Sequence, residues 1–118
     1  MSPRANYKRG DVLLVLYPHS DLRTATLRPA IVVQADGLET GIPQVIVAMI
    51  TSRMFRANHP SRVKVLLSSP EGLQSGLLTD SVVVTDNLAT VVASAIERVI
   101  GSLPMQPIDR SLRHTLGL

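Results

Sequence analysis

The chain has 118 residues, of which 45% are hydrophobic and 18% charged, and its formal net charge is +3 at pH 7. This composition excludes a mainly disordered polar chain, and the length predicts a single domain over residues 1–118. Cysteine is absent and three histidines are scattered, which excludes a disulfide framework and leaves no ligand set with zinc-site spacing. We therefore expect neither a metal nor another cofactor.

No segment has the pattern of a membrane-directed sequence. The longest apolar runs, residues 12–17 and 45–50, are far shorter than the roughly 20 residues needed to span a bilayer. Residues 1–9 are polar and lack the apolar stretch of a signal peptide. The sequence therefore predicts a cytoplasmic protein with no membrane partner.

Several segments have the residue pattern of β-strands. The first is a short apolar run that Gly10 opens and Pro18 closes, and a later one alternates Val63 and Val65 with charged residues. Between the first two strands we expect a polar surface loop over residues 19–27, and Asp36-Gly37 has the composition of a turn. The predicted strands are residues 11–17, 28–34, 42–51, 62–67 and 81–85.

Two helical segments are predicted near the C-terminus. Ser94 and Glu97 have the spacing of a capping box, which predicts a short helical turn. Ile108 and Leu112 lie four residues apart, so residues 107–116 are expected to form a helix that stops at Gly117. Short strands followed by two small helices predict a mainly β fold, with an antiparallel sheet curved strongly or closed into a small barrel.

Positive charge is concentrated in the middle of the chain. No acidic residue occurs between Glu39 and Glu71, and this interval holds four cationic side chains, those of Arg53, Arg56, Arg62 and Lys64. Such a run produces a local positive field that suits a phosphate backbone. A solvated loop and strand face would have the same composition, so the charge pattern alone leaves both interpretations open.

Three segments in the same order resemble the MazF/PemK toxin family. The first joins Lys-Arg-Gly-Asp-Val at residues 8–12 to Leu-Arg-Pro-Ala-Ile-Val-Val at residues 27–33. The second is Val-Ile-Val-Ala-Met-Ile-Thr-Ser at residues 45–52, and the third spans residues 80–90 with the segment 94–103 after it. The resemblance covers most of the chain, and its specificity comes from the three segments together.

The resemblance implies an SH3-like barrel and a homodimer. It also implies the toxin of a type II toxin-antitoxin system, a metal-independent endoribonuclease that cleaves single-stranded RNA at short motifs and is bound by a cognate antitoxin. Arg28 and Thr51 match the family's catalytic Arg and Thr. The residues implied to contact RNA are His19, Ser52, Arg53, Asp86 and Asn87.

General chemistry limits what these residues could do. Without a metal, the accessible route is attack of a ribose 2′-hydroxyl on the adjacent phosphorus. Deprotonating a guanidinium at neutral pH costs roughly 7 kcal/mol or more, so Arg28 suits charge stabilisation and proton donation rather than general base catalysis. Thr51 would hold a phosphate oxygen. The group that removes the 2′ proton could be Asp86, His19 or a solvent chain.

Residues of these types also occur in ordinary structural roles. An Arg before Pro at a strand start is usually a surface charge, and Asp86-Asn87 has the composition of a turn. The chain also departs from the common family pattern at Ala89 and Val92, two positions of the RNA surface that the resemblance implies. The alternatives are a non-enzymatic CcdB-like toxin that binds DNA gyrase and a catalytically decayed RNA-binding member of the family.

Overall fold

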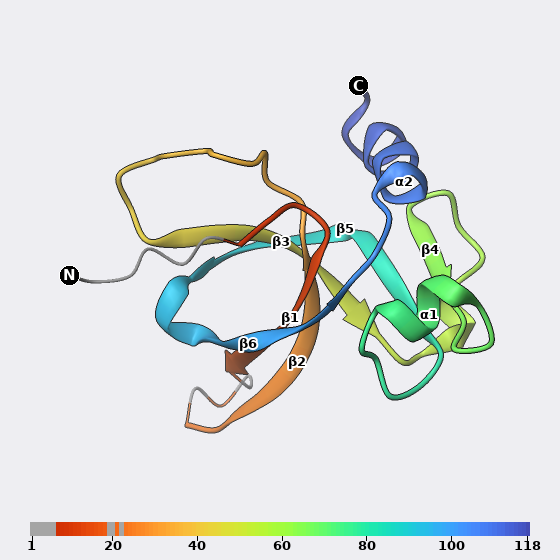
Figure 1. Cartoon of the computed structure of the whole chain (residues 1–118), viewed down its shortest axis with the longest axis horizontal. Coiled ribbons are helices and arrows are strands. Elements are labelled where there is room, and N and C mark those ends of the chain that lie inside the picture. The colour runs from red at the N-terminus through yellow and green to blue at the C-terminus, as the bar shows by residue number, and fades with distance from the viewer. Residues whose placement is uncertain (1–6, 19–20, 22) are drawn as a thin grey trace.

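The computed structural model describes residues 7–18, 21 and 23–118. Figure 1 shows a strongly curled sheet, with β4, α1 and α2 gathered at one end of the molecule. The elements in chain order are β1 (Asp11–Pro18), β2 (Ala25–Val32), β3 (Gln44–Thr51), the 3₁₀ turn η1 (Met54–Arg56), β4 (Arg62–Val65), α1 (Pro70–Gln74), β5 (Ser81–Val92), the 3₁₀ turn η2 (Ala93–Ala95), β6 (Ile96–Ser102) and α2 (Gln106–Leu116).

The described strands form one antiparallel sheet in the order β4-β5-β3-β2-β1-β6. Its outer strands, β4 and β6, are not paired with each other, so the sheet curls without closing into a complete barrel. The mainly β fold with a short helix and a C-terminal helix is confirmed. None of the helices in the described ranges is long and apolar enough to cross a bilayer.

The two faces of the sheet carry separate hydrophobic cores. Neighbouring residues of one strand belong to different cores, as Val12 and Leu13 of β1 do, because successive side chains of a strand point to opposite faces. One core includes Ile108 and Leu112 of α2, which confirms the apolar face predicted for this helix. α2 ends at Gly117, as predicted, and Gly117 has the left-handed conformation common at helix ends.

A wide irregularity interrupts the pairing of β3 with β5. Ala48 pairs with Leu88, whereas the next residue, Met49, pairs with Val84. Residues 85–87 of β5 are therefore extra residues without partners in this ladder, as in a β-bulge. β5 continues past this point to Val92, so the predicted strand 81–85 is only the first part of a longer element.

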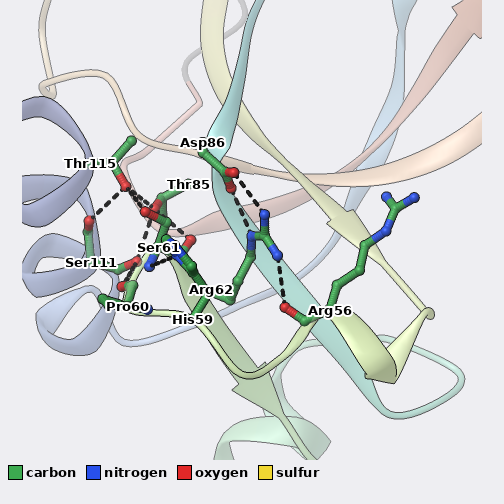
Figure 2. A network of polar contacts seen from close by, with 9 residues as sticks. All are labelled: Arg56, His59, Pro60, Ser61, Arg62, Thr85, Asp86, Ser111 and Thr115. Carbon is green, nitrogen blue, oxygen red and sulfur yellow. Dashed lines mark hydrogen bonds and ion pairs between the residues drawn. The ribbon is translucent and has the colours of Figure 1, made fainter.

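Hydroxyl groups fasten α2 to β5 beside this bulge (Figure 2). The buried Thr85 Oγ1 lies 2.9 Å from Ser111 Oγ and 2.8 Å from Thr115 Oγ1, and it donates to the Ser61 carbonyl at 2.7 Å. Ser111 also donates to the Pro60 carbonyl at 2.8 Å. These bonds fix the start of β4 and the bulge of β5 to the same helix.

The short helical turn predicted around Ser94 is present, but the capping box that predicted it is not. Only residues 93–95 form a 3₁₀ turn, and Glu97 lies in β6. Pairing of β6 with β1 prevails over the local capping signal, because it buries Ile96 against the core around Val15. The short helix α1 was not predicted from the sequence, although Ser69 caps it by accepting the Gly72 amide at 3.0 Å.

Candidate active site

The candidate site lies where β2 and β3 separate from each other. The two strands are paired from Val32 with Val47 to Ala30 with Met49, and their pairing then stops although both strands continue. If the same register were extended by two residues, Arg28 would stand opposite Thr51. Beyond the split, β2 stays paired with β1 and β3 with β5, so the strand ends remain anchored as they diverge.

A pocket of about 540 Å³ occupies this region. Its walls come from β1, β2, the end of β3 with the residues after it, the loop after α1, the start of β5, and β6. They are Leu14, Leu27, Arg28, Pro29, Ile50, Thr51, Ser52, Arg53, Gly76, Leu77, Leu78, Thr79, Ser81, Arg98 and Ile100.

The charge of the pocket is positive. Arg28, Arg53 and Arg98 line it, and no Asp or Glu of the described chain does so. The two ion pairs seen between described residues, Arg9 with Asp109 and Arg62 with Asp86, involve none of these three arginines. Several hydroxyl groups accompany the guanidinium groups, those of Thr51, Ser52, Thr79 and Ser81. Arginine donors together with hydroxyls are the groups that bind phosphate oxygens.

Thr51 has a defined local geometry at the end of β3. Its Oγ1 accepts a hydrogen bond from the Arg53 amide at 3.2 Å, which is a common arrangement where a Thr begins a turn. The hydroxyl hydrogen of Thr51 is thus not used in this bond. A threonine held in this way can donate its hydrogen to an anionic oxygen placed in the pocket.

The structure brings together part of the predicted site. Arg28, Thr51, Ser52 and Arg53 line the same pocket. His19 lies outside the described residues. Asp86 and Asn87 are exposed residues of the β5 bulge and do not line the pocket, so their predicted contact with RNA stays a prediction.

Asp86 is engaged by Arg62. Arg62 Nε donates to Asp86 Oδ1 and its NH2 group to Oδ2, both at 2.8 Å, in the two-pronged geometry typical of Arg with a carboxylate (Figure 2). These hydrogen bonds lower the pKa of the Asp86 carboxyl and raise that of Arg62, and the charges of Arg62 and His59 lower the pKa of Asp86 further. Arg62, one of the four cationic side chains between Glu39 and Glu71, is therefore already paired and is less available to bind a polyanion.

Arg98 is a site residue that was not predicted from the sequence. It belongs to β6, whose pairing with Leu14 of β1 sets Arg98 beside the pocket. No strand was predicted for this segment, so the position of Arg98 had no basis in the sequence. The wall from Gly76 to Thr79 was also missed, because only the folded chain brings the loop after α1 against β6.

Metal ligands do not gather at this site. In the ranges that the structure describes, no group of three or more His, Asp or Glu side chains is placed to hold a metal ion.

Another pocket, of about 370 Å³, lies between β4 and α2 and is lined by Pro60, Arg62, Val63, Lys64, Pro107, Arg110 and Ser111.

Comparisons with known proteins agree with this architecture. A family model described as a PemK-like, MazF-like toxin of a type II toxin-antitoxin system matches residues 8–116. Among solved structures, an endoribonuclease from Mycobacterial species has a TM-score of 0.71 at 22% identity and covers 99% of this chain and 97% of its own.

Two further solved structures with this fold contain a second protein. An endoribonuclease in complex with its cognate antitoxin, also from Mycobacterial species, has a TM-score of 0.72 at 23% identity and covers 95% of this chain and 96% of its own. A MazE-MazF structure from Deinococcus radiodurans has a TM-score of 0.71 at 15% identity, with coverage of 96% and 98%. At these identities the likeness shows a shared fold.

Proposed function

Because the chain belongs to the family of PemK-like and MazF-like toxins of type II toxin-antitoxin systems, we propose that it is an endoribonuclease that cleaves single-stranded RNA without a metal ion. The observation that carries this proposal is the meeting of Arg28 and Thr51 in one positively charged pocket. Two of the solved structures with this fold are themselves named endoribonucleases, which supports the same activity.

The proposed reaction is an internal phosphoryl transfer. The 2′-oxygen of a ribose forms a bond to the adjacent phosphorus, the bond from phosphorus to the 5′-oxygen breaks, and the products end in a 2′,3′-cyclic phosphate and a 5′-hydroxyl. Arg28 stabilises the negative charge of the phosphorane and donates a proton to the leaving 5′-oxygen. The Thr51 hydroxyl holds a non-bridging oxygen, and Arg53 and Arg98 neutralise neighbouring phosphates.

The remaining role in this reaction is that of the group that accepts the 2′ proton. The candidates from the sequence are Asp86, His19 and a solvent chain. Asp86 is the weakest of the three, because both of its carboxylate oxygens accept hydrogen bonds from Arg62 and it does not line the pocket.

The proposed partner is an antitoxin protein. One of the solved structures with this fold is named as a complex with its cognate antitoxin, and another is named as MazE-MazF. We propose that a segment of the antitoxin occupies the pocket, where acidic side chains would find three arginines and no carboxylate from the described part of the chain. The functional unit is proposed to be a cytoplasmic homodimer.

The first experiment compares the parent protein with Arg28→Ala and Arg113→Ala on a long single-stranded RNA in EDTA. Arg113 is an exposed residue of α2 that does not line the pocket, so its loss changes the net charge equally. We expect the parent and Arg113→Ala to leave cyclic-phosphate and 5′-hydroxyl ends, and Arg28→Ala to cleave about 100- to 1000-fold more slowly. Fragment ends are identified by mass spectrometry.

Three outcomes would contradict the proposal in different ways. Cleavage that EDTA abolishes would remove the metal-free mechanism, and full cleavage by Arg28→Ala would remove the role of Arg28. A folded parent that cleaves none of several RNAs would leave a toxin that only binds, and trapping of DNA gyrase on DNA in arrested cells would then identify it as a gyrase poison.

A further inference from the structure

The segment that follows Thr51 carries two pocket residues but has little core packing of its own. Ser52 and Arg53 line the pocket, and η1 comes directly after them. None of the three residues of η1 is buried, and Phe55 is 77% exposed. The position of this segment therefore depends on hydrogen bonds rather than on burial.

From its hydrogen bonds we infer that Asp86 and Arg62 form a positioning clamp for residues 51–56 in RNA cleavage, an inference that rests on the proposed function. While Arg62 Nε and NH2 bind both oxygens of Asp86, its NH1 donates to the Arg56 carbonyl at 2.9 Å. Figure 2 shows the guanidinium between the carboxylate and that carbonyl. Asp86 thus orients Arg62, and Arg62 holds the end of η1.

A continuous series of hydrogen bonds links the clamp to the catalytic hydroxyl. The Arg56 amide donates to the Arg53 carbonyl at 3.1 Å, and the Arg53 amide donates to Thr51 Oγ1 at 3.2 Å. These bonds lead from Arg56 through Arg53 to Thr51, and both Arg53 and Thr51 line the pocket. A shift of the Arg56 carbonyl would therefore move Arg53 and turn the Thr51 hydroxyl.

Asp86 and Arg62 are themselves held more firmly than residues 51–56, which they position. Asp86 is an extra residue of the β5 bulge, and Arg62 pairs with Val84 at the start of β4. Thr85, directly before Asp86, is fully buried, and its amide donates to the Ser61 carbonyl at 2.9 Å. Asp86 and Arg62 are therefore both held next to the hydroxyl cluster that joins β5 to α2.

This geometry makes Asp86 and Arg62 positioning residues rather than catalytic ones. A displacement of about 1 Å in a positioned group can cost on the order of 100-fold in rate without changing substrate binding to the same extent. Loss of the clamp should accordingly lower kcat by a larger factor than it raises KM, because Thr51 acts on the reacting phosphate whereas Arg53 contributes only part of the phosphate binding. Loss of a direct RNA contact would instead raise KM or change the cleavage motif.

The test uses Asp86→Asn, Arg62→Gln and the double variant, with kcat and KM measured on one short RNA that carries a single cleavage site. Asp109→Asn is the matched control, because it breaks a second ion pair whose side chains have similar exposure, 28% and 31% against 21% and 39%. We expect each single clamp variant to lose about 10- to 100-fold in kcat. The double variant should be no slower than the slower single one, and Asp109→Asn should keep the parent kcat.

Amide hydrogen exchange gives a second readout that does not depend on cleavage. In Asp86→Asn, the amides of Arg56 and Ala57 should exchange at least several-fold faster than in the parent, whereas those in the pairing of β3 with β5 should not. Unchanged exchange at these two amides would overturn the clamp even if the parent proves not to cleave RNA. A folded Asp86→Asn with the parent kcat, losses that multiply in the double variant, or a changed cleavage motif would also overturn it.

Discussion

The Asp86 carboxylate gives a pH dependence that can be measured on the folded protein. Hydrogen bonds from Arg62 lower its pKa in the folded state below the ordinary value of 3.8. Since the pKa is lower when the chain is folded, the pair stabilises the fold at pH above this value, and the contribution is lost as pH falls through the folded pKa. Arg62 and His59 are the charged groups that act on Asp86.

We therefore expect the parent to lose thermal stability more steeply between pH 5 and pH 3 than Asp86→Asn does. The measurement is Tm by circular dichroism at pH 7, 5, 4 and 3. Glu97→Gln, which removes an exposed carboxylate of β6, should retain the slope of the parent. Parallel Tm profiles for the parent and Asp86→Asn would show that this ion pair adds no stability.

At the scale of elements, the pocket wall depends on close contact between the loop after α1 and β6. Gly76 has φ of +74°, and a Cβ added to it would lie 1.9 Å from the Ile100 carbonyl oxygen. Gly37 has nearly the same φ, +71°, but a Cβ there would meet nothing within 4 Å. Alanine substitutions at these two glycines can therefore separate the free-energy cost of the left-handed backbone from the cost of crowding against β6.

Gly37→Ala should lower the free energy of unfolding by about 1 kcal/mol, the cost of a left-handed alanine. Gly76→Ala should lower it by about 3 kcal/mol or more, because the wall must also move away from β6. Urea unfolding measures both values. Equal losses for the two variants would mean that the loop can leave β6 at no cost.

The predictable part of this fold is the part encoded by local pattern. Apolar runs and alternation located the strands around Val12, Val47 and Val65, and the four-residue spacing of Ile108 and Leu112 located α2. The strand β6 was not predicted because it is selected by a distant partner, β1, and not by its own residues. Pairing order and the open edges of the sheet depend on such long-range contacts and have no local signal.

The candidate site was likewise predictable from the sequence only in part. Arg28 and Thr51 were found through the family resemblance, and the register of β2 with β3 explains how residues 23 positions apart reach one pocket. The pairing of Asp86 with Arg62 depends on extra residues in the β5 bulge, which no spacing in the sequence reveals. The Arg98 position required knowledge of β6.

At the scale of the whole molecule, the distribution of charge matters more than its sum. The chain carries 12 Lys and Arg residues against 9 Asp and Glu, a modest excess. Three of the arginines line one pocket without a carboxylate of the described chain beside them, while other cations, such as Arg9 and Arg62, are paired with Asp109 and Asp86. The field is thereby focused at the pocket, where a phosphate backbone would gain most.

Salt dependence of RNA binding tests this focusing. Each phosphate neutralised on a single strand contributes about 0.7 to the slope of log K against log salt concentration. Arg98→Ala, made in the slowly cleaving Arg28→Ala background so that the RNA stays intact, should reduce the steepness of the slope by about 0.7. Arg113→Ala in the same background removes an equal charge from the exposed side of α2 and should leave the slope unchanged. Fluorescence anisotropy with a labelled RNA at several KCl concentrations measures both, and equal changes in the two slopes would show that net charge, not the pocket, attracts the RNA.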